Sequence, residues 1–437
     1  MTSDDLAAGL VACGLNPAER PAKRALFDLV LGATGNRSGQ RQPDQYVAWV
    51  PGRLEVFGKH TDYAGGRSLV CAVPRGLTFA ASGRPGGVHV VDARRREDVT
   101  LERWDPAASR PADQHTGWRH YVEVVVRRLE RNFPGAPIAA DVAFASDLPR
   151  AAGMSSSSAL VAGLAAALVR VARIDARPEW RTNIRDRLDA AGYYACLENG
   201  RSFGTLEGDA GVGTHGGSED HAAIVDGRPG RLSAFAFVPM RRLGTAPVPE
   251  DWCFVLAPSG VKSEKTGAAR DSYNRLARGV AVLLELWNGA ESPCTSLGAA
   301  LESGPPAVER LRDLVRRSAI PEWPPGALEK RLDHFVREDS RVLEAMAAFR
   351  ESDATRLSSA AAQSQADAEA LLENQVPDTM ALARAAREHG ALAACSFGAG
   401  FGGSVWAVVE RRAADDFAAA WYPRAFVADP GPPLTEL

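Results

Sequence analysis

The segment that most constrains this chain is DLPRAAGMSSSSAL, which occupies residues 147–160. Gly153 can adopt backbone conformations closed to other residues, and any of the serines at 155–158 could cap a helix that begins there. Free N–H groups at the start of a helix attract anions, and serine hydroxyls can bond phosphate oxygens or complete the coordination of Mg²⁺. The apolar residues 159–169 predict a buried helix. The segment therefore indicates a phosphate-binding loop. A serine-rich loop with an ordinary helix cap remains the alternative, since the GxxxxGK[ST] signature is absent.

Composition narrows the class of protein and of partner. A chain of 437 residues is long for one core, so two domains are expected, with a boundary near residue 230. A hydrophobic fraction of 45% and a charged fraction of 24% are typical of a soluble globular protein. The net charge of −3 gives no basic surplus for nucleic acid or anionic lipid. We therefore expect small-molecule partners, no nucleic acid, no membrane and a monomer, although the sequence does not fix the oligomeric state.

The cysteines and the N-terminus indicate the compartment. Six cysteines are spread singly without a CxxC pair, which favours reduced thiols over a zinc site or a disulfide framework. The first residues lack a basic region followed by an apolar core, and the apolar runs are too short to span a bilayer. A cytoplasmic protein is expected.

The order of patterns along the chain predicts a mixed α and β protein. A helical pair is expected within residues 6–31, and a strand at 45–57 runs into the polar turn GKHTDYAGG. Short β-like runs at 68–73, 77–82, 88–92 and 99–103 predict a mainly antiparallel sheet. Helices are expected at 118–132, 181–198, 272–287, 307–318, 341–373 and 380–388, and strands at 138–144 and 252–257. A second glycine-rich turn, SFGAGFGGSVW, lies at 396–406 and precedes another strand.

Three separated segments together resemble the motifs of the GHMP kinase superfamily. They are PGRLEVFGKHTDYAGG at 51–66, LPRAAGMSSSSAL at 148–160 and SFGAGFGGSVW at 396–406. The first looks most like the sugar-binding signature of galactokinases, and weaker likenesses occur at TGWRHYVEVV, at 196–203 and at KTGAARDSYNR. The resemblance implies an α+β fold of two domains. Residues 1–230 would form an N-terminal domain like ribosomal protein S5 domain 2, and residues 231–437 a ferredoxin-like C-terminal domain.

The same resemblance implies an ATP-dependent and Mg²⁺-dependent sugar 1-kinase, which transfers the γ-phosphoryl group to the anomeric hydroxyl of galactose or a related sugar. Asp220 matches the aspartate that orients or deprotonates this hydroxyl, and Arg53 the arginine beside it. A guanidinium nearby would keep the carboxylate ionised. The alternative for Arg53 and Asp220 is an ordinary surface ion pair.

Further residues match positions around the two substrates. Mg²⁺ would be held by Glu198 and one of the serines, with Ser157 preferred, although Glu198 would alternatively be a carboxylate on a helix surface. The residues expected at the sugar are Lys59, His60, Asp62, Gly217 and Tyr273, and those at ATP are Gly153, Met154, Ser155, Ser156, Ser157 and Ser158.

Two departures from the galactokinase pattern bear on substrate choice. The signature usually reads GR-x-N-x-x-G-E-H-T-D-Y, but here Lys59 occupies the glutamate position and Glu55 the asparagine position. In galactokinases that glutamate would accept a hydrogen bond from the sugar's distal hydroxyl, whereas an ammonium group can only donate. If Lys59 faces the pocket, it would recognise an acidic group such as a uronic acid carboxylate. Alternatively, Glu55 neutralises Lys59, or Lys59 points into solvent.

The second departure lies in the phosphate loop, where Ala151 and Ala152 replace residues that are often glycine, while Gly153 keeps the turn. Three functions stay open at this point. The first is a sugar 1-kinase for galactose, a related neutral sugar, or galacturonate and glucuronate. The second is a non-catalytic galactokinase-like sugar sensor. The third is another small-molecule kinase, against which the HTDY segment and Tyr273 argue.

Overall fold

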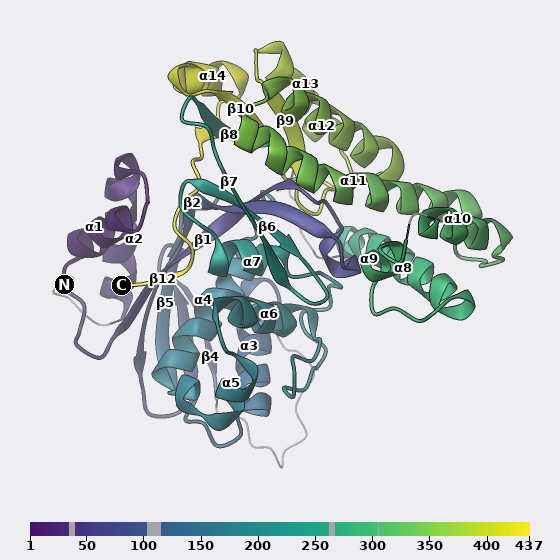
Figure 1. Ribbon diagram of the computed structural model, residues 1–437. Coiled ribbons are helices and arrows are strands. Elements are labelled where there is room, and N and C mark those ends of the chain that lie inside the picture. The colour runs from purple at the N-terminus through teal and green to yellow at the C-terminus, as the bar shows by residue number, and fades with distance from the viewer. Residues whose placement is uncertain (35–39, 103–114, 262–266, 305) are drawn as a thin grey trace.

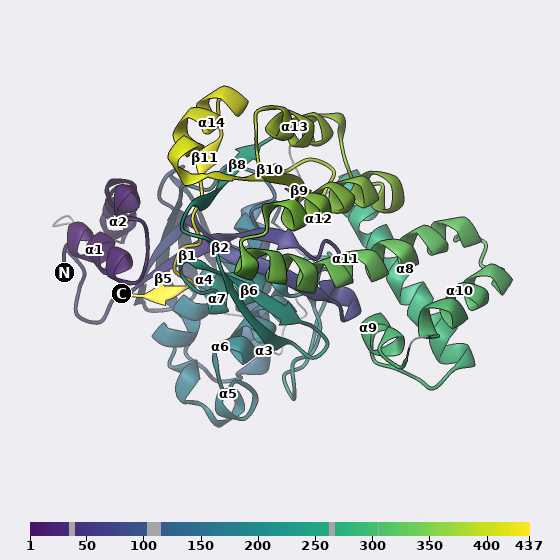
Figure 2. The same ribbon diagram turned by 45° about the horizontal axis from the view of Figure 1, so that its top comes forward.

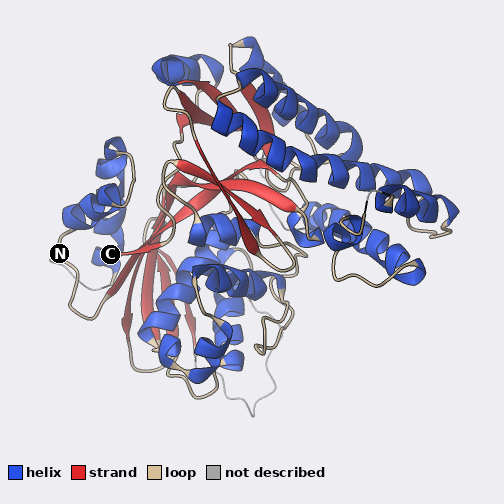
Figure 3. Ribbon diagram, in the orientation of Figure 1, coloured by secondary structure: helices blue, strands red, loops and turns tan. Residues whose placement is uncertain are grey.

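The computed structural model describes residues 1–34, 40–102, 115–261, 267–304 and 306–437. Within these residues the strands form two sheets, which Figure 3 shows in red between layers of helices. The larger sheet has the order β12-β1-β2-β5-β3-β4, and β6 and β7 extend from β2. Its strands are β1 (Tyr46–Phe57), β2 (Arg67–Gly83), β3 (Val88–Asp92), β4 (Glu97–Leu101), β5 (Ala140–Ser146), β6 (Arg231–Ala236), β7 (Arg241–Pro247) and β12 (Thr435–Glu436).

The smaller sheet has the order β11-β8-β10-β9, and its described strand pairs are all antiparallel. It consists of β8 (Trp252–Pro258), β9 (Ala393–Phe397), β10 (Ser404–Glu410) and β11 (Phe426–Val427). The helices α11 to α14 lie around this sheet in Figures 1 and 2. They are α11 (Pro325–Glu351), α12 (Ala354–Asp367), α13 (Pro377–Glu388) and α14 (Ala414–Trp421).

The remaining helices form three groups. The helices α1 (Ser3–Ala12) and α2 (Arg20–Ala33) lie together at one edge of the molecule in both views (Figures 1 and 2). The helices α8 (Gly267–Ala290), α9 (Leu297–Leu301) and α10 (Ala307–Arg317) project from the opposite side. The larger sheet is covered by α3 (Trp118–Asn132), α4 (Ser156–Val171), α5 (Pro178–Asn183), α6 (Arg187–Asn199) and α7 (Glu219–Asp226). No helix in the described part of the chain has the length and apolar character needed to cross a membrane.

Helix α4 lies on the larger sheet because its residues 159–169 are apolar and, apart from Ala166, buried. It packs so closely on the sheet that a Cβ at Gly163 would lie 2.2 Å from Cε2 of Phe79 on β2. Such a contact admits only glycine, since a larger side chain would push the helix away. The start of α4, where the serines lie, is thus fixed by the hydrophobic core.

The expected elements are largely present, with three differences. The runs 68–73 and 77–82 form the single strand β2, and β3 pairs with β5 in parallel within an otherwise antiparallel sheet. The expected helix at 181–198 is two helices, α5 and α6, separated by residues 184–186. The helix expected at 341–373 begins earlier, as α11 at Pro325, and is followed by α12.

The fold is α+β, as expected, and strands from both halves of the chain share the larger sheet. Strands β6 and β7 pair with β2 and with each other although they follow residue 230, and β12 at the C-terminus pairs with β1. The division into residues 1–230 and 231–437 therefore stays a proposal.

Lys23 on α2 ties the N-terminal helices to the entrance of the serine segment. Its side chain is fully buried, and its ammonium donates to Asp147 at 2.5 Å and to Glu19 at 3.0 Å. The ammonium also lies 5.1 Å from the ring centre of Trp49. Asp147 in turn accepts a hydrogen bond from the backbone N–H of Gly76 at 2.7 Å. The start of the phosphate loop is therefore held by a charge contact from another part of the chain.

We expect Lys23→Met to lower the free energy of unfolding by about 3 kcal/mol, because it leaves Asp147 without its buried partner. Chemical denaturation measures this change. The control is Arg20→Met, which breaks an exposed pair with Asp4 and should cost less than about 1 kcal/mol. Equal effects of the two substitutions would contradict this assignment.

Candidate active site

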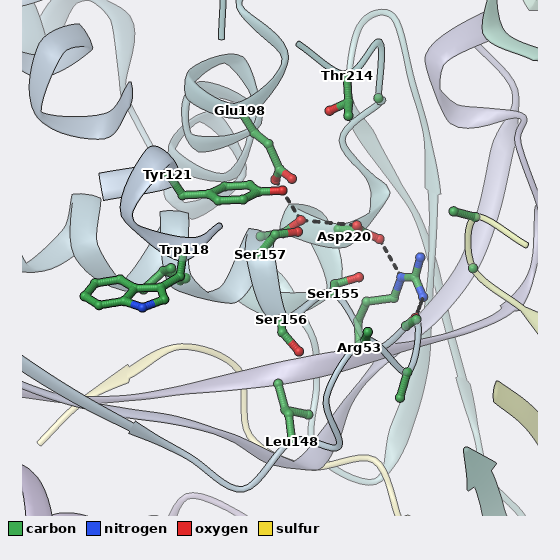
Figure 4. Close-up of a pocket in the computed structure, with 18 of the residues that line it drawn as sticks. Arg53, Trp118, Tyr121, Leu148, Ser155, Ser156, Ser157, Glu198, Thr214 and Asp220 are labelled. Atoms are coloured by element: carbon green, nitrogen blue, oxygen red, sulfur yellow. Dashed lines mark hydrogen bonds and ion pairs between the residues drawn. The ribbon is translucent and has the colours of Figure 1, made fainter. Parts of the chain in front are cut away.

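A cavity of about 1140 Å³ lies where the serine segment, β1 and α7 meet. Its lining comes from both ends of the sequence, since Gly398 and Ala399 of the second glycine-rich turn contribute together with residues near the N-terminal end of α4. Figure 4 shows Arg53, Asp220, Ser157 and Glu198 grouped on one side of this cavity and Trp118 on the other. The three motifs predicted from the sequence are thus brought together around one space.

The serine segment forms a tight loop before α4. Ala151, Gly153 and Ser155 all have positive φ, at 48°, 70° and 57°, and α4 begins at Ser156. Positive φ strains a residue with a side chain, so the loop is held by its surroundings. Ser155 occupies the N-cap position, but no hydrogen bond from its side chain caps the helix. The serines of this loop line the cavity, which accords with the expected contact to phosphate.

The loop is held through its carbonyl groups. The Ala152 carbonyl accepts a hydrogen bond from Ser404 Oγ at 2.6 Å, and the Gly153 carbonyl one from Arg53 Nη1 at 2.9 Å. A Cβ at Gly398 would lie 3.0 Å from the oxygen of Gly153. The second glycine-rich turn therefore approaches the loop backbone closely, which explains why small residues are needed in both segments.

Arg53 and Asp220 form a buried ion pair. Arg53 Nε lies 2.5 Å from Asp220 Oδ1, and the side chains are 5% and 14% exposed. Burial alone would lower the pKa of Arg53, but Asp220, Glu219 and Glu55 outweigh burial and raise this pKa. The guanidinium therefore stays charged, and the alternative of an ordinary surface pair does not hold.

Glu198 on α6 faces the serine segment. Ser158 Oγ lies 2.8 Å from Glu198 Oε2 and 3.2 Å from Asp220 Oδ2, so this hydroxyl links the two carboxyl groups. Glu198 is buried, which excludes the alternative of a helix-surface carboxylate, and its Oε1 accepts no hydrogen bond from the described residues. A buried carboxylate oxygen without a donor, beside hydroxyl groups, suits Mg²⁺, which prefers oxygen ligands. The preference for Ser157 as the metal ligand stays a prediction; Ser157 lines the cavity next to Ser158.

The residues expected at the sugar come from distant segments and meet at one end of the cavity. Asp62 accepts hydrogen bonds from the backbone N–H groups of Glu219 at 3.0 Å and Tyr63 at 2.8 Å. A Cβ at Gly217 would lie 1.9 Å from Asp62 Oδ2, so glycine is required there. Burial raises the pKa of Asp62, although these N–H groups oppose the shift.

His60 and Tyr273 complete this end of the cavity. His60 Nδ1 lies 2.8 Å from the Tyr63 hydroxyl, and His60 Nε2 lies 3.1 Å from the carbonyl oxygen of Ala399. The ring of Tyr273, carried by α8, lies 5.2 Å from the ring of His60. Both side chains line the cavity, as do Asp62 and Gly217, so these four residues lie together; their contact with a sugar stays a prediction.

Lys59 does not line the cavity, so the condition under which it would recognise an acidic sugar group is not met in this structure. Its side chain is fully buried, and its ammonium lies 2.9 Å from Ser364 Oγ, 3.3 Å from Cys395 Sγ and 3.8 Å from Glu338 Oε1. Burial alone would lower the pKa of Lys59, but Cys395 and Glu338 raise it, so the ammonium stays charged. The partner is Glu338 on α11, which also accepts the backbone N–H of Gly58 at 3.0 Å.

Some cavity residues were not singled out from the sequence. Trp118 and Tyr121 on α3 and Phe144 on β5 line the cavity, and the Trp118 and Phe144 rings meet edge to face at 5.3 Å. Figure 4 shows Trp118 on the side away from Arg53 and Tyr121 beside Ser157 and Glu198. The weak galactokinase likeness at TGWRHYVEVV, which lies at the start of α3, could have indicated that α3 contributes residues to the cavity. Glu219 was also missed, although it directly precedes Asp220.

Comparison with known proteins places these features in a family context. The galactokinase galactose-binding signature matches residues 36–83, the GHMP kinases N terminal domain residues 120–192, and the GHMP kinases C terminal model residues 345–428. A galactokinase of Roseiflexus sp. (strain RS-1) is 26% identical over 383 residues, which cover 85% of each chain. A galactokinase of Glaesserella parasuis serovar 5 (strain SH0165) is 24% identical over 331 residues, which cover 72% of this chain and 71% of that relative.

Solved structures share the fold. Lactococcus lactis galactokinase complexed with galactose superposes with a TM-score of 0.73 at 22% identity, covering 90% of this chain and 96% of that one. Methanococcus jannaschii mevalonate kinase superposes with a TM-score of 0.53 at 12% identity, covering 89% and 99%. The chain therefore has the arrangement of both GHMP kinase domains.

We expect Lys59→Met to lower the free energy of unfolding by about 3 kcal/mol, because the buried Glu338 carboxylate loses a cation. The double variant Lys59→Met with Glu338→Gln should recover part of this loss, which a double-mutant cycle by chemical denaturation measures. The exposed pair Lys330–Glu373 supplies the control, since Lys330→Met should cost less than about 1 kcal/mol. A Lys59→Met protein as stable as the wild type would show that the contact contributes little.

Proposed function

Since this chain is a member of the GHMP kinase superfamily that resembles galactokinases, we propose that it is an ATP-dependent sugar 1-kinase acting on a neutral aldose such as galactose. The observation that carries the proposal is the position of the Arg53–Asp220 ion pair in the cavity. The pair lies between the serine segment and the end of the cavity that is lined by His60, Asp62 and Tyr273. The cavity has hydroxyl groups and helix N–H groups on one side and carboxylate and aromatic groups on the other. Phosphoryl transfer requires this kind of site, which positions an anion beside a polar acceptor.

The chain's residues have distinct roles in this reaction. Asp220 accepts the proton of the anomeric hydroxyl, whose oxygen forms a bond to the γ-phosphorus of ATP as the bond from that phosphorus to the β–γ bridging oxygen breaks. The products are the sugar 1-phosphate and ADP, and the proton on Asp220 then passes to solvent. Arg53 keeps the Asp220 carboxylate ionised and oriented before transfer.

The serine segment binds the phosphates through its hydroxyl and backbone N–H groups, and Trp118 with Tyr121 offers an aromatic wall for the base. Glu198 and Ser157 would hold Mg²⁺, which when bound neutralises charge on the phosphate oxygens. Ser158 lies between Glu198 and Asp220, and its single hydroxyl hydrogen can be donated to either carboxylate, with the shorter distance to Glu198.

The charge at the sugar end favours a neutral substrate over a uronic acid. Arg53 is surrounded by carboxyl groups, and Lys59, on which an acidic substrate would depend, is buried against Glu338. A sugar carboxylate at this end would face Asp62 and Glu219 without an uncommitted cation among the described residues at that end. Neither Lys59 nor Glu338 is among the described residues that line the cavity. The distal hydroxyl of the sugar would therefore not meet a charged acceptor at position 59, where the galactokinase signature has a glutamate.

An ATP-consumption screen over galactose, arabinose, galacturonate and glucuronate tests the substrate class. We expect turnover of the neutral sugars and little of the two uronates, with the new phosphate on the anomeric oxygen by phosphorus NMR. Preferred turnover of a uronate would overturn the neutral-sugar assignment. No turnover with any sugar, together with sugar-dependent ATP binding, would favour a non-catalytic sensor.

We expect Asp220→Asn to lower kcat by about 10²–10⁴-fold, because the amide cannot accept the hydroxyl proton. Steady-state kinetics on the best sugar of the screen measures this, and KM for ATP should change little. Asp98→Asn is the matched control, since Asp98 is 61% exposed and pairs with His89 on the larger sheet. Unchanged kcat in Asp220→Asn would remove Asp220 from the reaction.

A further inference from the structure

Two buried glutamates lie near Nη2 of Arg53, whose Nε holds Asp220. Glu219 Oε1 lies 3.4 Å from Arg53 Nη2, and Glu55 Oε2 lies 3.8 Å from the same nitrogen. Glu219 also accepts a hydrogen bond from Ser68 Oγ at 2.6 Å. The side chains of Glu55 and Glu219 are only 1% and 9% exposed. They come from β1 and from the first turn of α7, so each sits beside a residue of the Arg53–Asp220 pair.

The charges around Arg53 do not balance if every carboxyl group is ionised. One guanidinium would then face three carboxylates, those of Asp220, Glu219 and Glu55, which leaves two negative charges in excess around Arg53. Burying an unpaired charge is costly. Lys59 also interacts with Glu55, but its own carboxylate partner is Glu338, whose Oε1 lies 3.8 Å from the ammonium.

The hydrogen-bond pattern gives a second, independent indication of a proton. Glu55 Oε1 is buried, and with Glu219 ionised no described residue donates a hydrogen bond to it. Glu55 Oε2 and Glu219 Oε1 lie 3.8 Å and 3.4 Å from the same nitrogen, Arg53 Nη2, so the two carboxyl groups are neighbours, and a hydrogen bond with Glu219 opposes the upward shift in the pKa of Glu55. Two carboxylates cannot bond each other, whereas a carboxylic acid donates to a carboxylate. One proton held between the two groups would permit this hydrogen bond and would remove one negative charge.

We propose that Glu55 and Glu219 share one proton and act as a positioning pair, which leaves the Arg53 guanidinium directed at Asp220. The inference rests on the proposed kinase function for its catalytic consequence, but the proton itself does not depend on it. Burial, Glu55 and Asp62 all raise the pKa of Glu219 well above its ordinary value, in agreement with this arrangement.

Loss of the shared proton would change the reacting centre in two ways. A second full charge behind Arg53 would draw Nη2 toward the pair and weaken its hold on Asp220. It would also add negative charge near the attacking oxygen and the γ-phosphate. Because the pKa of Glu219 is raised, the competent protonated form exists below that pKa and is lost as pH rises through it. The other titratable or charged groups that interact with the pair are Arg53, Lys59, Asp62, Tyr63, Asp220, Tyr273 and Glu338.

Infrared difference spectroscopy tests whether the Glu55–Glu219 pair carries a proton, and it does not require the protein to turn over a substrate. We expect wild-type protein at neutral pH to show a carbonyl band of a protonated carboxyl group that shifts in D₂O and is missing in Glu219→Gln. Glu55→Gln removes the accepting carboxylate and the like charge, so it should also abolish or displace the band. Glu123→Gln, at a buried glutamate paired with His115, is the control and should keep it. A spectrum without a band assignable to Glu219 or Glu55 would overturn the proposal, even if no sugar is phosphorylated.

The pH dependence of kcat then separates positioning from a purely structural role. In wild type we expect kcat to fall by about tenfold when the shared proton is lost on the alkaline side. Glu219→Gln keeps a neutral group at this position, so kcat at neutral pH should stay within about threefold of wild type and the alkaline fall should disappear. Superimposable pH profiles of wild type and Glu219→Gln, with a lower stability of the variant alone, would show that the pair does not position Arg53.

Discussion

The buried guanidinium of Arg53 is the constraint on which the rest of the site depends. Its Nε holds Asp220 of α7, its Nη1 holds the Gly153 carbonyl of the serine segment, and its Nη2 faces Glu219. A fully charged group without access to water is stable only if its donors have partners, so these segments cannot move independently. The serine segment and the start of α7 are thus held relative to each other by one residue of β1.

Local chemistry explains which parts could be predicted from the sequence. The glycine and serine content of 147–160 constrains that segment by itself, so its place before a buried helix followed from the residues. Asp220 and Arg53 were paired correctly because the resemblance carries their positions as a set. The long strand β2 was divided in the prediction because Pro74 and Gly76 indicate a turn, whereas pairing with β1 on one side and β5 and β6 on the other keeps it extended.

Lys59 shows why the remainder could not be predicted. Its partners Glu338, Ser364 and Cys395 lie about three hundred residues further along the chain, as the separations of 279, 305 and 336 residues for its hydrogen bonds show. Nothing near Lys59 in sequence distinguishes a lysine that faces the cavity from one that faces α11. The Glu338 carboxylate also accepts the N–H of Gly58, so the reversed charge at position 59 is matched by an acidic residue of α11. The substitution thus changes how the turn is held, and the cavity loses a charged residue at that point.

The carboxyl groups around the cavity carry more negative charge than Arg53 can balance. The sugar end carries Asp62, Glu55, Glu219 and Asp220 around Arg53, and ATP would add further negative charge at the serine end. Such a site is unfavourable unless protons or cations offset the charge where it is not used. In the proposed reaction, Asp220 has to remain ionised to accept a proton, and Glu198 has to remain ionised to bind a metal ion. The negative charge is therefore reduced by protonating a carboxyl group that neither accepts the substrate's proton nor binds the metal ion. Among such groups, Glu55 and Glu219 are the pair that contacts Arg53. A neutral sugar adds nothing to this balance, whereas a uronate would add another negative charge beside groups that already exceed the cations available.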